Sequence, residues 1–347
     1  MKKYRYTLIF LLPLTVYLAL TQAGWLTHLP KLVFYGLVPL LELILKPDHS
    51  NLSHEMELKW QRDPFFDLLL YAVIPFHIGL LIYFFFVIDS TPPGTTEFYG
   101  RISAVGLMLG ITGINLGHEL GHRHNRLQQF LGEILLLTSL NTHFLPYHNA
   151  GHHRNVATPQ DPATARKNEI LFWFWLRSQI GGYIQAWQIE LKRMQKLGRA
   201  ALSLHNRMVV YTIAQVALLA AIYLVFGLKV LLAFLLAATI GIILLETVNY
   251  IEHYGLLRQK LPNGKFERVN HSHSWNSDHL LGRFLLFNLS RHSDHHYHAG
   301  KKYQVLRSLP ASPQMPTGYP GMMLLALLQP LWFYIMNKKL QDVGQAA

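Results

Sequence analysis

Long apolar blocks constrain the fold of this sequence more than any other feature. Each has roughly the 17 to 25 residues that an α-helix needs to cross a bilayer, or slightly fewer. Only 14% of the 347 residues are charged, against about a quarter in an ordinary soluble domain. We expect residues 1–347 to form a single all-α integral-membrane domain. About six transmembrane helices are predicted, in the blocks Tyr6–Leu20, Lys31–Leu45, Phe65–Ile88, Ile102–Leu116, Met208–Phe226 and Val230–Thr247.

Basic residues indicate which helix ends face the cytoplasm, because cytoplasmic loops are enriched in lysine and arginine. The N-terminus, the loop 46–62 and the segment 123–207 carry them, whereas Ala23–Pro30 and Asp89–Gly100 carry none. The N-terminus, the middle segment and the C-terminal third are therefore predicted to be cytoplasmic. The first block could instead be a signal peptide, but the later blocks commit the chain to the membrane in either case.

The charge and the cysteine content exclude several classes of protein. A net charge of +12 on the cytoplasmic face favours contact with anionic lipid or an acidic protein. The sequence has no groove-reading or RNA-binding motif, so we expect no nucleic-acid partner. The absence of cysteine excludes disulfides, iron–sulfur clusters and thiolate-ligated haem or zinc. Any bound metal must be held by nitrogen or oxygen.

Histidines gather in four clusters that indicate a metal centre. His118 and His122 are four residues apart at the end of an apolar block, so both imidazoles project from one helix face. Nine clustered imidazoles exceed the ligand shell of one ion but suit two neighbouring ions, and imidazole binds Zn, Cu, Fe and Ni. The nine candidates are His118, His122, His148, His152, His153, His253, His292, His295 and His296.

Two alternatives bear on this prediction. H-E-x-x-H is also a zinc-protease pattern, but here it follows a membrane span and three more clusters come after it. The stretch Phe130–Leu145 would place His148–His153 on the opposite side if it crossed the membrane. Its residues Glu133, Asn141, Thr142 and His143 are costly at a bilayer centre, so we interpret it as an interfacial or re-entrant helix.

The other histidines divide into two groups. Five lie away from the clusters and are interpreted as structural or surface residues: His28, His49, His54, His77 and His205. Six lie nearer and are left open: His124, His143, His271, His273, His279 and His298.

These motifs resemble the alkane hydroxylase branch of the membrane fatty-acid desaturase and hydroxylase superfamily. The resemblance runs from the first block to about Lys338. It rests on H-E-L-G-H-R, H-N-A-G-H-H-R-N-V-A-T-P-Q-D-P-A-T-A-R, N-Y-I-E-H-Y-G-L-L-R-Q-K, H-S-W-N-S-D-H and R-H-S-D-H-H. Desaturases and sterol-type hydroxylases share the three general histidine boxes. The segment N-Y-I-E-H-Y-G-L favours the alkane hydroxylase branch.

The resemblance implies that the nine candidate histidines bind two non-haem iron ions in a cytoplasmic helical cap. It makes Glu119, Asp161, Glu252 and Asp294 candidates for orienting the imidazoles by accepting their free N–H groups. The chain departs from the family pattern at Tyr147, where relatives usually have glutamate, and at Asn155, where aspartate is common. Two carboxylates near the metal site are thus missing.

The function that the resemblance implies is hydroxylation of the terminal C–H of a medium-chain alkane or alkyl group, with O₂ as co-substrate. An alkyl-aromatic (xylene-type) hydroxylase or a lipid desaturase is the alternative within the superfamily. A membrane metal-binding or transport protein is the alternative outside it. Transporters carry their ionisable residues within spans, whereas these clusters lie at span ends, so the enzyme is favoured. The implied location is a bacterial inner membrane.

Electrons must come from separate chains, since a chain without cysteine cannot contain a rubredoxin domain. We expect a rubredoxin-type acidic carrier, with its reductase, to dock on the basic face. Phe34 and Tyr35 are candidates for limiting the length of substrate in an apolar channel. The candidate docking residues are Arg258, Lys260, Lys265, Arg268, Lys301, Lys302 and Arg307.

Overall fold

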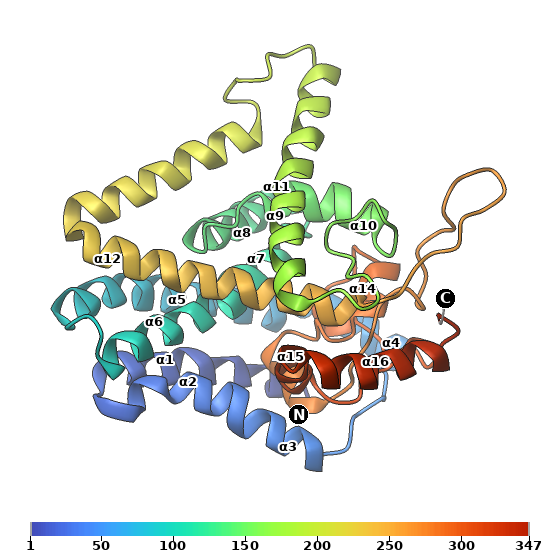
Figure 1. Cartoon of the computed structure of the whole chain (residues 1–347), viewed down its shortest axis with the longest axis horizontal. Helices are drawn as coiled ribbons and strands as arrows, with labels where there is room; N and C mark the ends of the chain where they lie inside the picture. Colours follow the sequence, from blue (N-terminus) through green and yellow to red (C-terminus); the bar gives the residue numbers. More distant parts are fainter. Residues whose placement is uncertain (1, 346–347) are drawn as a thin grey trace. The chain divides into compact units, whose positions relative to one another are not determined.

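A computed structural model describes residues 2–345 and is helical over most of that range (Figure 1). The N-terminal helices are η1 (Lys2–Phe10), α1 (Leu11–Thr21), η2 (Gly24–His28), α2 (Leu29–Leu32), η3 (Val33–Leu37), α3 (Val38–Ile44), α4 (His54–Arg62) and α5 (Pro64–Ser90). The middle of the chain forms α6 (Thr96–Met108), η4 (Leu109–Asn115), α7 (Leu116–Gly121), α8 (Arg126–Thr138), α9 (Phe144–Tyr147), η5 (His148–His152), α10 (His153–Asn155) and α11 (Leu171–Lys196). The remaining helices are α12 (Arg207–His253), α13 (Leu280–Leu285), α14 (His292–Tyr297), η6 (Tyr303–Val305), α15 (Tyr319–Leu327) and α16 (Gln329–Asp342).

Four helical segments in the described range are long and apolar enough to cross a membrane: Lys3–Thr21, Gly24–Ile44, Pro64–Ser90 and Arg207–His253. The last is the 47-residue α12, which bends at Gly227, where φ is 80°. Only glycine adopts this backbone conformation without strain. The predicted blocks Met208–Phe226 and Val230–Thr247 are the two arms on either side of this bend. The all-helical membrane fold is confirmed, and the count of six spans stays a prediction.

Two further segments bear on that count. The predicted block Ile102–Leu116 lies in an unbroken helical run, in which the π-helix η4 separates α6 from α7. The stretch Phe130–Leu145 is not one helix, because α8 ends at Thr138 and Leu140 has a φ of 54°. A 13-residue helix such as α8 extends only about 20 Å. It is therefore too short to span a bilayer, which supports the prediction for that stretch.

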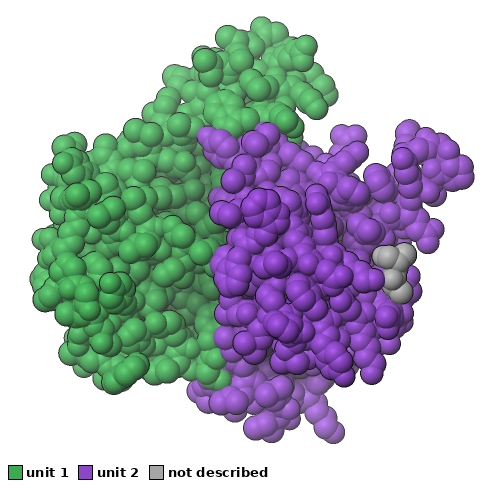
Figure 2. All heavy atoms as spheres, viewed as in Figure 1, with its two compact units in different colours: residues 1–36, 63–145, 187–245 green, residues 37–62, 146–186, 246–347 purple. Residues whose placement is uncertain are grey.

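The described residues form two compact units, each built from three separate stretches (Figure 2). One unit comprises residues 1–36, 63–145 and 187–245, and the other comprises residues 37–62, 146–186 and 246–347. We refer to them as the first and the second unit.

In the first unit, α7 and α8 approach so closely that only glycine fits between them. A Cβ atom on Gly132 would lie 2.8 Å from the carbonyl oxygen of Gly117. Small residues at helix contacts allow this approach in membrane proteins. Ile114, Leu136, Phe144 and Leu145 form a buried apolar cluster beside it. This packing fixes α7, the helix that carries His118.

In the second unit, aromatic residues anchor the end of α12. Tyr250 and Tyr254 lie 5.2 and 5.3 Å from Trp332, measured between ring centroids. Their hydroxyls donate hydrogen bonds to the Glu169 carbonyl, at 2.7 Å, and to Asn337 Oδ1, at 2.9 Å. The segment N-Y-I-E-H-Y-G-L therefore fixes the last turn of α12 on two sides, and this turn carries His253.

Candidate metal centre

Four buried histidines of the second unit converge on one point. They are His152, His253, His292 and His296, from η5, the end of α12 and α14, and one ligand atom from each lies within 4.8 Å of all the others. The Nε2 atoms of His152 and His296 are 3.2 Å apart, as are those of His253 and His292. All four side chains are buried. The chain thus brings together four nitrogen donors from three segments that lie far apart in the sequence.

This spacing is the one expected for ligands of a single metal ion. A metal–imidazole bond is about 2.1 Å long, so neighbouring nitrogens on one ion lie roughly 3.0 to 3.4 Å apart. Burial, and to a smaller extent the neighbouring imidazoles, lowers the pKa of His296 well below its usual value. A neutral imidazole keeps the lone pair that a metal needs. The donor set is all nitrogen, which suits iron, zinc and copper.

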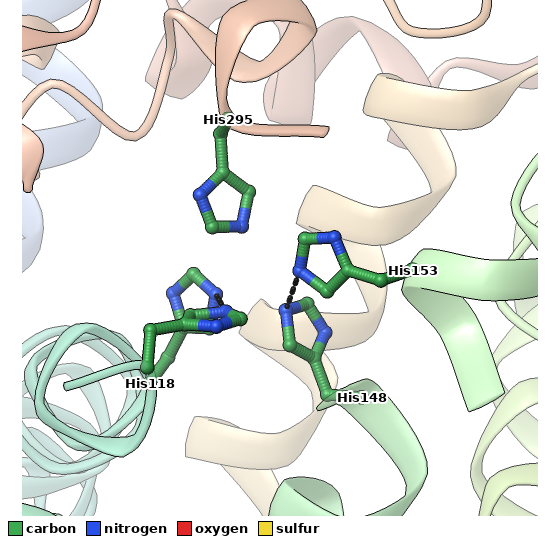
Figure 3. Close-up of side chains that lie close together, drawn as sticks. His118, His148, His153 and His295 are labelled. Carbon is green, nitrogen blue, oxygen red and sulfur yellow. Dashed lines mark hydrogen bonds between the residues drawn. The ribbon is translucent and has the colours of Figure 1, made fainter. Parts of the chain in front are cut away.

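A second group in the same unit comprises His148, His153 and His295 (Figure 3). Their imidazoles point toward one another, and the Nε2 atoms of His148 and His153 are 2.9 Å apart. The π-helical turn η5 explains the pairing, because five residues rather than four bring side chains onto one face of a π-helix. His152, four residues after His148, therefore joins the first group.

The remaining candidate ligands lie in the first unit. The Nε2 atoms of His118 and His122 are 2.9 Å apart, as their spacing on one helix face predicts. Glu119, expected to orient an imidazole, forms a salt bridge to Arg123, with 2.7 Å between Oε1 and Nη2. Arg123 is also 3.4 Å from Asp67. Glu119 thereby links the last turn of α7 to the segment that follows it through a buried ion pair.

Asp161 is the carboxylate with the clearest link to a candidate ligand. Its Oδ2 accepts hydrogen bonds from His152 Nδ1, at 2.9 Å, and from Thr164, at 2.7 Å. Its Oδ1 accepts from the Tyr147 hydroxyl at 2.6 Å. Burial opposes ionisation, but the charge and hydrogen bond of His152, together with the two hydroxyls, lower the pKa of Asp161 to about 2. An anion at this position holds the proton of His152 on Nδ1 and leaves Nε2 free for a metal.

Glu252 and Asp294 have different surroundings. Glu252 Oε1 accepts a hydrogen bond from Tyr319 at 2.7 Å and lies 3.2 Å from His292 Nδ1. Asp294 accepts from His298 Nδ1, from Lys301 Nζ and from the Arg307 backbone, at 2.8 to 3.0 Å. Glu252 therefore lies beside a candidate ligand, and its role in orienting that ligand stays a prediction, whereas Asp294 links α14 to the segment that follows it.

An ion pair that we did not single out from the sequence fixes the start of α14. Arg291 Nε donates to Asp278 Oδ1 at 3.0 Å, and both side chains are buried. The other groups of Arg291 bond the carbonyls of Asp48, Ser50 and Leu306. Both residues lie within the motifs H-S-W-N-S-D-H and R-H-S-D-H-H, which was the available signal. The ion pair and these hydrogen bonds fix Arg291, the residue before His292.

Several other histidines have partners outside the clusters. His77 is buried and lies 2.8 Å from the hydroxyls of both Thr112 and Thr138. His49 pairs with Asp278 at 3.0 Å. Of those left open, His273 is buried against Glu267 at 3.2 Å, and His298 bonds Asp294. Their contacts account for them without a metal.

The candidate docking residues fall into two sets. Arg258 donates to the carbonyls of Arg154 and Glu267, Lys301 pairs with Asp294, and Arg307 pairs with Glu57 at 3.0 Å. These three stabilise the second unit internally. Lys302 is half-buried. The exposed members are Lys260, Lys265 and Arg268, on the loop that follows α12.

The candidate channel residues lie on the π-helical turn η3. Phe34 is buried and Tyr35 is half-buried. π-Helical turns are frequent at functional sites, but a role in limiting substrate length stays a prediction.

Comparison with known protein families assigns the class. The family described as fatty acid desaturase matches residues 98–326, which is more than half of the chain and includes all nine candidate ligands. The chain belongs to this family of integral-membrane proteins.

Individual relatives narrow the assignment. Alkane 1-monooxygenase 1 of Alcanivorax borkumensis is 39% identical over 96% of this chain and 83% of its own length. Alkane 1-monooxygenase of Ectopseudomonas oleovorans is 38% identical over 98% and 86%. The xylene/toluene monooxygenase hydroxylase component of Pseudomonas putida is 27% identical over 81% and 76%. Within the family the chain therefore groups with the alkane 1-monooxygenases, which are oxidoreductases.

Proposed function

We propose that this protein is a non-haem di-iron monooxygenase that converts the terminal methyl group of a medium-chain alkane or alkyl substrate to a primary alcohol. The observation that carries the proposal is the convergence of four buried imidazoles within 4.8 Å in a chain grouped with the alkane 1-monooxygenases. The four-histidine group would hold one iron, and the set of nine histidine ligands that the resemblance implies would hold two. The proposed location is a bacterial inner membrane, with the metal centre toward the cytoplasm.

The reaction consumes O₂, two electrons and two protons, and it yields the alcohol and water. The two irons, when bound, supply the O₂ activation that no side chain can provide. The protein orients the ligands and excludes water. His152 is fixed by Asp161, and all members of the four-histidine group are buried. A dry site favours oxidation of an inert C–H bond over side reactions with solvent.

The test is metal and product analysis of purified protein in detergent. We expect about two irons per chain, nitrogen-rich ligation in X-ray absorption, and O₂-dependent conversion of octane to 1-octanol once reductant and carrier are supplied. One zinc per chain, or no stoichiometric metal after iron loading, would overturn the proposal.

Product identity separates the two other enzymes of the superfamily. An alkyl-aromatic hydroxylase gives a benzylic alcohol from xylene, and a desaturase gives an alkene. The 27% identity to the xylene/toluene hydroxylase component makes xylene the appropriate competing substrate. We expect turnover of octane to exceed that of xylene at equal concentration, and the reverse order would favour the aromatic hydroxylase.

Electrons for the reaction are proposed to come from a rubredoxin-type acidic carrier, reduced by its own reductase. Lys260, Lys265 and Arg268 are exposed on the loop after α12 and carry the charge that such a carrier would contact. Attraction between opposite charges raises association rates and weakens as salt screens it.

Reversing these three charges to glutamate should slow reduction by the carrier about tenfold or more at low ionic strength, since steering contributes that much to association. The measurement is stopped-flow reduction at two salt concentrations. The matched control reverses three exposed charges elsewhere, Lys192, Lys196 and Arg199, and should change the rate less than twofold. Equal slowing by both triple variants would mean that net charge, and not this loop, governs docking.

A further inference from the structure

Tyr147, at the position where the resemblance implies glutamate, lies within the hydrogen-bond network of Asp161. Its side chain is buried, and its hydroxyl is 2.6 Å from Asp161 Oδ1. The backbone N–H of Ala163 donates to the same hydroxyl at 3.1 Å. The phenol therefore accepts one hydrogen bond and donates its only proton to the carboxylate. The direction of the bond is fixed by the surrounding groups.

The carboxylate of Asp161 receives hydrogen bonds on both oxygens. Tyr147 and the Ala163 N–H, at 3.3 Å, donate to Oδ1, while His152 and Thr164 donate to Oδ2. Thr164 in turn accepts from the Ala157 N–H at 2.9 Å, so its own proton is directed to Asp161. Donors on both sides prevent the carboxylate from rotating away from His152.

The helix α11 packs against the ring of Tyr147 with a glycine at the point of contact. A Cβ atom on Gly182 of α11 would lie 3.2 Å from two ring carbons of Tyr147, and one on Gly181 would lie 2.8 Å from Pro162. The paired glycines therefore let α11 approach both the phenol and the loop that carries Asp161. A Cβ atom at position 182 would require the phenol ring to move by a few tenths of an ångström.

We propose that Tyr147 is a positioning residue, which sets the strength of the hydrogen bond from His152 to Asp161. A carboxylate that already accepts a short bond from a phenol is a weaker acceptor for His152. His152 then donates less electron density to a bound metal. The inference rests on the proposed function, because it requires iron at the four-histidine group. In this chain, the phenol hydroxyl would then set the donor strength of His152 and thereby the reduction potential of the bound iron.

The test is the Tyr147→Phe variant, which keeps the ring and removes the hydroxyl. We expect iron content close to that of the wild type and a reduction potential shifted to a more negative value, because Asp161 then accepts more strongly from His152 and makes it a stronger donor to the metal. The potential is measured by redox titration followed by Mössbauer spectroscopy. A merely structural role would not move the potential in a fixed direction.

Two further variants complete the design. Tyr211→Phe removes a buried hydroxyl of the first unit, one that bonds Glu133 Oε1 at 2.7 Å, and should leave the potential unchanged. Gly182→Ala should push the phenol ring slightly, lengthen its bond to Asp161, and shift the potential in the same direction as Tyr147→Phe by a smaller amount. If Tyr147→Phe binds two irons at the wild-type potential, the role of Tyr147 is overturned while the function stands. Failure of the wild type to bind iron would instead overturn the proposed function.

Discussion

Replacing His253 by alanine is expected to abolish alkane hydroxylation and to remove about one of the two proposed irons. His253 is fully buried, its Nε2 lies 3.2 Å from that of His292, and its ring centroid lies 4.9 Å from that of His152. Loss of a residue that only orients a ligand costs about 10- to 100-fold, so loss of a ligand should lower turnover by roughly a hundredfold or more. Iron analysis, Mössbauer spectra and octane turnover measure the effect.

The control must separate loss of a ligand from loss of a buried side chain. His273 is as deeply buried, at 1% exposure against 0% for His253, but it bonds Glu267. His273→Ala should retain two irons and most of the activity, with a lower thermal midpoint. Full turnover and two irons in His253→Ala would remove His253 from the ligand set.

The candidate ligands could be recognised from the sequence because their spacing is local. Positions i and i+4 on a helix share a face, and this holds for His118 with His122 and for His292 with His296. The membrane helices were equally accessible, since hydrophobic length is a property of contiguous residues. The fold class followed from these two patterns.

The sorting of ligands within the second unit could not be predicted. An α-helical reading of H-N-A-G-H-H pairs His148 with His152, whereas the π-helical turn pairs His148 with His153. The choice depends on a single extra residue in one turn, which tertiary packing decides. The bend at Gly227 could not be predicted from the sequence either, because glycine is compatible with both a continuous and a broken helix.

Long-range pairs account for the other differences. The sequence alone suggested that Arg258, Lys301 and Arg307 form a basic surface. Their partners Glu267, Asp294 and Glu57 lie 7 to 250 residues away along the chain. From the sequence, Tyr147 was interpreted as the loss of a carboxylate near the metal site. In the structure a phenol bonds the carboxylate at position 161 instead. Side-chain partners of this kind are set by the fold and leave no local pattern.

Asp161→Asn is expected to weaken iron binding by about 10- to 100-fold, the usual cost of losing the partner of a metal-bound histidine. The amide has one acceptor oxygen where the carboxylate has two. Because His152, Thr164 and Tyr147 all donate to Asp161, the amide N–H₂ must face at least one donor. A buried donor left without an acceptor costs about 1 to 3 kcal/mol, and the remaining hydrogen bond to His152 is neutral and weaker.

Asp294 provides the comparison that tests this ranking. It is also buried and adjacent in sequence to candidate ligands, but its carboxylate bonds His298, Lys301 and the Arg307 backbone. Asp294→Asn should therefore weaken iron binding less than threefold in protein that remains folded. Chelator competition on both variants, with circular dichroism to verify folding, gives the two affinities. If both variants lose iron equally, proximity in sequence and not the hydrogen bond to His152 determines which carboxylate matters. If only Asp161→Asn loses iron, the anion at position 161 is what fixes His152 for the metal.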